Sequence, residues 1–110
     1  MDKLIQKIVA LGVPGIILLV AVNVSGLAGA AAITSALALF GGPFGMIGGI
    51  GAMGLAVLIM DGISKYGFEK IFEEVVQDLI RKGESKDSIK RKIEGYPISK
   101  DLKTKLNTLL

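Results

Sequence analysis

The sequence of 110 residues predicts an all-α protein, in which a membrane-embedded Gly/Ala-rich helical hairpin or bundle is followed by short amphipathic cytosolic helices. Residues 8–60 contain no Asp, Glu, Lys, Arg or His, whereas a helix at the surface of a soluble domain needs a polar face. Nearly all charged residues follow in the last fifty positions, where apolar side chains recur with a helical period. We therefore divide the chain into a hydrophobic membrane-associated region, residues 1–62, and a charged amphipathic helical tail, residues 63–110.

Glycines and prolines divide the uncharged region into three segments. The first covers residues 1–24, with a kink at Gly12-Val13-Pro14-Gly15 where the proline must bend or restart the helix. A turn at residues 23–26 leads to a second segment, 27–40, and Gly41-Gly42-Pro43 precedes a third, which runs from Phe44 to Tyr66. A membrane span needs about 20 apolar residues. The first and third segments reach that length, whereas the second is too short to cross comfortably and is expected to be re-entrant or enclosed in a bundle.

Small residues recur four positions apart along the second and third segments. Such a ridge lets helix backbones approach closely, which drives the association of helices in lipid. We predict that it packs helices together, within one chain or between copies. We interpret the Thr34 and Ser35 hydroxyls as bonding back to carbonyl groups one turn earlier, with pore lining as the alternative. The predicted packing residues are Gly26, Ala30, Thr34, Ala38, Gly42, Gly45, Gly49 and Ala52.

The charged tail predicts three short helices. Apolar residues between Phe68 and Ile80 form one stripe of a helix with acids early and bases late, as the helix dipole favours, and Gly83 ends it. Ser85 is placed to cap a second helix, and Ser99 to cap a third that carries the C-terminal leucines. These helices contain too few large apolar residues to form a secure core of their own.

A basic cluster in the tail is a candidate for contact with an anionic leaflet, where each base is worth about 1 kcal/mol. Asp87 and Glu94 dilute the cluster, so an ordinary solvated helix face is the alternative. The cluster consists of Lys86, Lys90, Arg91 and Lys92.

Composition predicts that the protein is not an enzyme and has no catalytic, cofactor or metal site. The chain has no Cys and no His, which excludes disulfides, thiolate ligands, a nucleophile–His pair and most zinc chemistry. Glu69, Glu73 and Glu74 are expected on the solvent face of their helix, without a companion motif. The Gly-rich stretch 41–54 lacks the Lys and Ser/Thr of a phosphate loop. A net charge of +3 with few aromatic residues does not indicate nucleic-acid binding.

Three stretches resemble a group of short bacterial membrane proteins of no assigned activity. They are the small-residue block 26–45, the Tyr66-Gly-Phe-Glu-Lys motif and the Tyr96-Pro-Ile-Ser-Lys-Asp-Leu-Lys tail, and the resemblance covers most of the chain. The run Gly29-Ala-Ala-Ala is also loosely similar to the Gly/Ala-rich interferon-induced small membrane proteins of animals, which lack the charged helical tail. The first resemblance implies a bacterial inner-membrane location.

Together these patterns predict a small, self-associating integral membrane protein, acting as a pore or membrane-perturbing effector under the control of its tail. Its expected partners are the lipid bilayer and further copies of itself. Bases flank the uncharged stretch at both ends, so the positive-inside rule places both termini in the cytoplasm. One alternative is a passive anchor or adaptor that recruits a soluble protein through residues 63–110. The other is a soluble helical oligomer that buries the Gly/Ala half between subunits.

Overall fold

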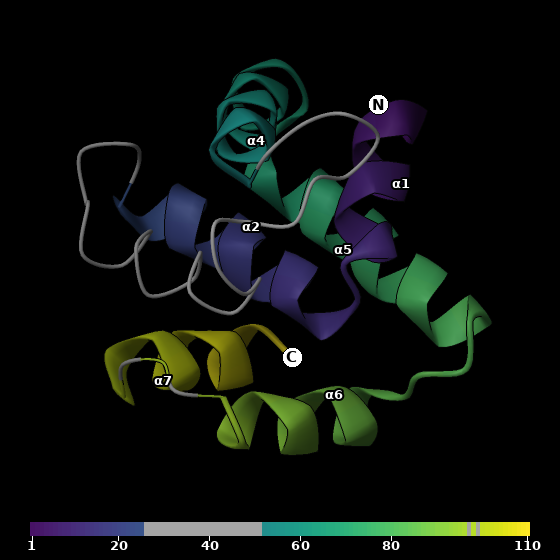
Figure 1. The fold of residues 1–110 in the computed structure, drawn as a ribbon, viewed down its shortest axis with the longest axis vertical. Coiled ribbons are helices and arrows are strands. Elements are labelled where there is room, and N and C mark those ends of the chain that lie inside the picture. The colour runs from purple at the N-terminus through teal and green to yellow at the C-terminus, as the bar shows by residue number, and fades with distance from the viewer. Residues whose placement is uncertain (26–51, 97, 99) are drawn as a thin grey trace.

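The computed structural model describes residues 1–25, 52–96, 98 and 100–110. This part of the chain is 85% helical in six helices and contains no strand, which confirms the predicted all-α class for the described residues (Figure 1). The predicted segment 27–40 and the start of the third segment lie outside it. The helices are α1 (Asp2–Ala10), α2 (Val13–Ser25), α4 (Ala52–Tyr66), α5 (Phe68–Arg81), α6 (Lys86–Glu94) and α7 (Lys100–Leu109).

The predicted interruption after residue 11 is a sharp bend between two helices. Gly12 has a φ of 72°, a left-handed conformation that favours glycine, and α1 and α2 meet at 120°. Pro14 lies in the first turn of α2, where its missing N–H costs no helical hydrogen bond. Among the described residues no single helix is long and apolar enough to cross a membrane, although α1 and α2 taken together reach the length and composition.

Helix α2 lies at the centre of the described structure and contacts all five other helices. Its residues Ile16–Val22 are at most 1% exposed. In Figure 1, α2 runs between an upper group (α1, α4 and α5) and a lower group (α6 and α7). A helix that is apolar on every side is stable in water only when it is enclosed on every side, and here the enclosing helices come from the same chain.

The surrounding helices each turn an apolar stripe inward. Helix α5 follows its predicted pattern except at Ile80, which is 42% exposed. The tail helices gain from α2 the core that their own sequences lack, since α5, α6 and α7 all contact α2. Helix α4 continues through the predicted division at residue 62. The buried stripe residues include Ile71, Val75 and Leu79 of α5, Ile89 and Ile93 of α6, and Leu102 and Leu106 of α7.

Two predicted helix ends are confirmed. The Ser85 hydroxyl accepts a hydrogen bond from the Ser88 backbone N–H at 3.1 Å, and the Ser88 hydroxyl accepts one from the Ser85 N–H at 2.9 Å. This reciprocal pair satisfies two backbone donors at the start of α6. Gly83, with a φ of 107°, follows α5 as predicted. The predicted cap Ser99 lies outside the described residues. The predicted turn at residues 23–26 is wrong at its start, because α2 continues through Asn23 to Ser25.

Gly15 sets how closely α1 and α2 can approach at their bend. A Cβ added there would overlap the carbonyl oxygen of Ile8, which belongs to the rigid backbone of α1. We expect Gly15→Ala to force the two helices apart and to lower the free energy of unfolding by about 1–3 kcal/mol, as overpacking commonly does. Thermal and denaturant unfolding followed by circular dichroism measures the change.

Gly95→Ala is the matched control. Gly95 has an ordinary right-handed conformation, and a Cβ there would meet only the Lys92 carbonyl oxygen at 3.5 Å. Its effect should stay within about 0.5 kcal/mol. Equal stabilities of the two variants would contradict the tight contact at Gly15.

Candidate functional site

The candidate functional element is helix α2 together with the tail helices α5, α6 and α7 that cover it, which we call the sheath. Burial of one aliphatic side chain is worth about 1.5–3 kcal/mol relative to water, and residues 16–22 are all buried aliphatic side chains. Exposure of α2 to water is therefore very costly. Transfer of the same side chains into hydrocarbon costs little, because lipid tails are as apolar as a leucine core. Helix α2 can thus exchange its protein sheath for lipid far more easily than for water.

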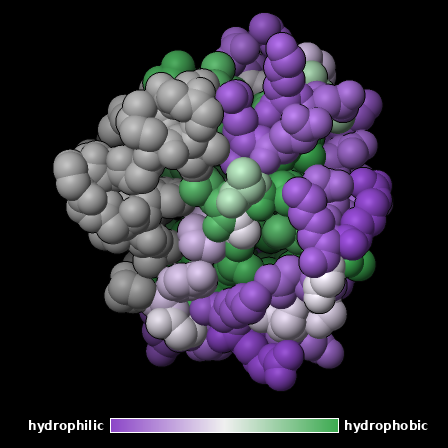
Figure 2. Space-filling model, turned by 45° about the vertical axis from the view of Figure 1, so that its right-hand side comes forward, coloured by the Kyte–Doolittle hydropathy of each residue, from purple (hydrophilic) through white to green (hydrophobic). Residues whose placement is uncertain are grey.

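The sheath is incomplete on the outside of the bundle. Figure 2 shows apolar residues open to view beside hydrophilic residues. A groove of about 330 Å³ opens between α5 and the C-terminal end of α7, and the exposed side chain of Ile80 contributes to its wall. Its apolar lining consists of Phe72, Val76, Ile80, Leu109 and Leu110. The contact between the tail helices is therefore partly open to solvent.

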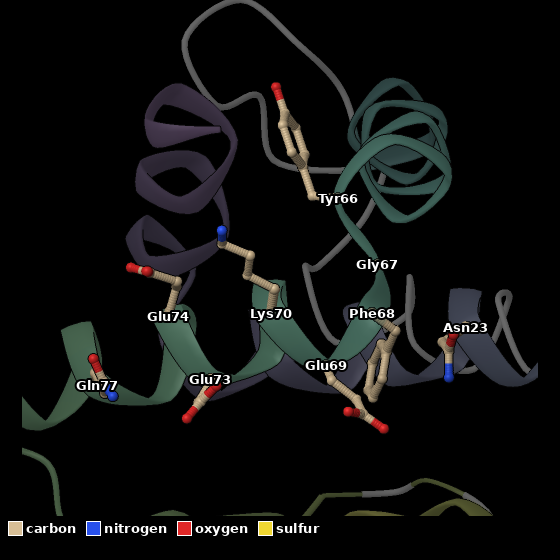
Figure 3. Close-up of a pocket in the computed structure, with 9 residues that line it drawn as sticks. All are labelled: Asn23, Tyr66, Gly67, Phe68, Glu69, Lys70, Glu73, Glu74 and Gln77. Carbon is tan, nitrogen blue, oxygen red and sulfur yellow. The ribbon is translucent and has the colours of Figure 1, made fainter.

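A wider polar groove of about 890 Å³ lies along α5, beside the turn from α4 and the end of α2 (Figure 3). Three carboxylates, Glu69, Glu73 and Glu74, come from α5, and Tyr66 and Asn23 come from α4 and α2. The described part of the chain contains no cluster of three or more acidic side chains arranged to hold a metal ion. Figure 3 shows Glu69 and Glu73 pointing to one side of α5 and Glu74 to the other, beside Lys70.

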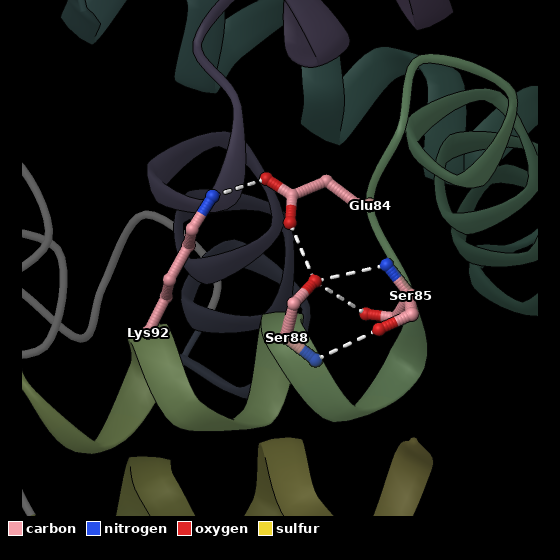
Figure 4. A network of polar contacts seen from close by, with 4 residues as sticks. All are labelled: Glu84, Ser85, Ser88 and Lys92. Carbon is pink, nitrogen blue, oxygen red and sulfur yellow. Dashed lines mark hydrogen bonds and ion pairs between the residues drawn. The ribbon is translucent and has the colours of Figure 1, made fainter.

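A polar network joins the end of α5 to α6 (Figure 4). The Glu84 carboxylate accepts hydrogen bonds from the Lys92 ammonium group and, at 2.6 Å, from the Ser88 hydroxyl. These bonds, that of Lys92 first, hold the pKa of Glu84 below its ordinary value. We call Glu84, Ser85, Ser88 and Lys92 the α6 latch, since they fix the helix to the chain that precedes it.

The predicted basic cluster does not form one patch. Lys92 is paired with Glu84, Lys86 lines the groove beside Ile80, and Lys90 is half-buried. Successive residues of a helix are rotated by about 100°, so Lys90, Arg91 and Lys92 point in different directions. The structure therefore disperses this candidate leaflet contact around α6.

The predicted packing ridge is represented in the described structure by Ala52 alone, the first residue of α4. The close helix approaches that the structure describes are at Gly15 and at Gly62, where an added Cβ would overlap Leu4. Sequence reasoning missed both positions as packing sites, because Gly15 was assigned to the break before α2 and Gly62 follows Asp61 in no pattern of small residues. The remaining ridge residues, Gly26, Ala30, Thr34, Ala38, Gly42, Gly45 and Gly49, lie outside the described residues.

The fold and site define a helical bundle built around one helix whose residues 16–22 are all apolar and buried. No family model matches the chain, and the comparisons with curated proteins and with solved structures found no match either. The resemblance to short bacterial membrane proteins stays a prediction.

The α6 latch makes stability depend on pH. Because the pKa of Glu84 is lowered in the folded protein, its contribution is present above the ordinary glutamate pKa, about 4.3, and is lost as the pH falls through the folded value. We expect Glu84→Gln to reduce the unfolding free energy by about 0.5 kcal/mol at neutral pH, the scale of a solvent-screened ion pair. The difference from wild type should vanish in acid.

The measurement is denaturant unfolding across about pH 2–7, a range that extends well below the ordinary glutamate pKa of about 4.3. Glu73→Gln is the control, because Glu73 is exposed and makes no ion pair with any described residue. A pH-independent gap between Glu84→Gln and wild type would rule out the latch as a titrating contact.

Proposed function

We propose that this protein inserts its uncharged region into a lipid bilayer, self-associates there and perturbs the membrane. Amphipathic helices α5, α6 and α7 cover α2 before insertion. The observation that carries the proposal is the central helix, whose residues 16–22 are buried and apolar on every side. That surface has one natural environment other than a protein core, the hydrocarbon of a membrane.

Length supports a hairpin. The uncharged stretch contains 53 residues, 8–60, and two crossings need about 40 apolar residues. The structure brings the two ends of this stretch together, because α1 contacts α4. A hairpin entering from one side of the membrane keeps that arrangement. The contact between α1 and α4 also supports the proposed topology, with both termini in the cytoplasm of a bacterial cell.

The sheath helices are suited to the change of environment. Each has an apolar stripe and a charged face, so each can leave α2 and lie in the plane of the bilayer interface. The apolar area that the sheath loses on α2 is then recovered on lipid. The α6 latch is one of the contacts that must open, which gives the tail control over insertion.

A second candidate function, a membrane anchor that recruits a soluble partner, is favoured by the acidic groove along α5. The groove is lined mainly by residues of the charged tail, and its three glutamates suit a basic protein surface. This function requires membrane binding without loss of the permeability barrier. The remaining alternative, an oligomer that buries the apolar half between subunits, is not needed to cover α2, since helices of the same chain already enclose it.

Dye release from liposomes tests the proposed function. We expect the full chain to release an encapsulated dye, and Glu84→Gln to release it about two-fold faster at neutral pH, since weakening the latch by about 0.5 kcal/mol changes a population by that factor. Asp101→Asn, at an exposed carboxylate that lines none of the grooves described, should match wild type. Membrane binding without dye release would reject the perturbing function in favour of the anchor, and equal rates for Glu84→Gln and Asp101→Asn would reject control by the tail.

Crosslinking in mild detergent tests self-association. Replacement of both Gly45 and Gly49 by Leu should block close backbone approach while the segment remains apolar, and so reduce the crosslinked oligomer without preventing membrane association. Leu58→Ile, equal in volume and outside the predicted ridge, should leave the oligomer unchanged. An unaltered ladder for the double variant would show that these glycines do not serve association between chains.

A further inference from the structure

A third groove lies between α1 and α4, on the side of the bundle away from the tail helices α6 and α7. Its volume is about 390 Å³. One wall is a single face of α1, with Lys3, Leu4 and Lys7 at helical spacing, and the facing wall comes from α4. The lining residues of α4 are Leu58, Asp61, Gly62, Lys65 and Tyr66.

The floor of the groove is apolar and tightly built. Gly62 is buried and has no side chain, which lets Leu4 lie directly against α4. Leu58 is 38% exposed, and its neighbour Val57 is 50% exposed. Large apolar side chains left open to solvent beside a groove indicate a surface that contacts an apolar partner.

The rim of the groove is cationic. It carries three lysines against one carboxylate, and that carboxylate, Asp61, is already engaged with Lys65 at 3.1 Å. Lys3 and Lys7 form no ion pair with any described residue. The groove along α5 has the opposite character, with three glutamates and one lysine. A basic groove and an acidic one therefore lie next to each other, with Tyr66 lining both.

We propose that the α1–α4 groove binds one anionic phospholipid of the bilayer surface. The phosphate lies between Lys3 and Lys7, with Lys65, which is paired with Asp61, beside them. The upper part of an acyl chain lies over Leu4 and Leu58. Charge complementarity selects an anion, and the apolar floor between the lysines selects an amphiphile, since a free phosphate leaves that floor in water. The inference deepens the proposed function by naming the lipid class that the protein recognises.

The position of the groove gives this contact a consequence. Lys7 and Asp61 are the charged residues that bracket the uncharged stretch, and both line the groove. A lipid bound there holds both ends of residues 8–60 at one leaflet. Insertion of the stretch between them then starts from a fixed depth and a fixed side.

Vesicle flotation tests the site. The full chain is mixed with vesicles of phosphatidylcholine alone or with about a third phosphatidylglycerol, an anionic lipid that attracts nearby bases. The groove variant carries Lys3→Gln, Lys7→Gln and Lys65→Gln. We expect it to lose about 100-fold in affinity for the anionic vesicles, from three bases each worth about a factor of five. Binding to neutral vesicles should change little.

The control variant carries Lys82→Gln, Lys100→Gln and Lys105→Gln, three exposed lysines outside the groove, and changes the net charge by the same amount. It should bind within about three-fold of wild type, the scatter expected for exposed charges. Equal losses in the two triple variants would overturn the site in favour of a general charge effect. Displacement of the vesicles by inorganic phosphate alone would overturn it in favour of a free anion.

Two further measurements separate this inference from the proposed function. The first is dye release by wild type, measured on the same anionic vesicles as the flotation. If wild type binds anionic vesicles through the groove but releases no dye, the proposed function fails and the lipid site stands. Unfolding curves of both triple variants should overlay that of wild type, and a groove variant that lost both binding and helical structure would overturn the assignment of these lysines to lipid.

Discussion

The structure depends on a helix that has no polar face. Helix α2 is buried along residues 16–22, and the five other described helices all contact it. Each of them is amphipathic to some degree because it has one side on α2 and one on solvent. The short tail helices illustrate the dependence most clearly. Ile89 and Ile93 of α6, or Leu102 and Leu106 of α7, are too few to form a core by themselves, yet they are stable partners for a wholly apolar helix.

Several local features could be predicted from the sequence because they depend on near neighbours. The bend at Gly12, the Ser85 cap and the stripe along α5 each follow from a short pattern of residues. The placement of α2 depends on contacts with distant parts of the chain. An uncharged helix can be covered by lipid, by other subunits or by helices of its own chain. The first two possibilities were predicted from the sequence, and the third was not. The dispersal of Lys90, Arg91 and Lys92 was missed because clustering in sequence is not clustering on a helix surface.

The grooves between helices were less predictable than the fold. Lys3, Lys7 and Lys65 were recognised as charges that flank an apolar stretch, but their meeting in one groove depends on the packing of α1 against α4 at Gly62. No short pattern reports such a contact between residues almost sixty positions apart. The groove along α5 likewise combines residues of α2, α4 and α5. Sites that join separate helices appear only when the helices are placed.

No buried polar side chain fixes the register of the helices among the described residues. Hydrogen bonds between buried polar groups select one alignment and penalise others, whereas aliphatic surfaces slide past one another at little cost. The polar contacts between α6 and α7 lie at the surface, and inside the bundle two close contacts fit the helices together by shape, where Gly15 receives Ile8 and Gly62 receives Leu4. The rest of the interface depends less on the identity of each aliphatic residue. Aliphatic residues there can be replaced by others of equal volume over evolution. At these two glycines, by contrast, an added side chain fits only if its neighbour shifts.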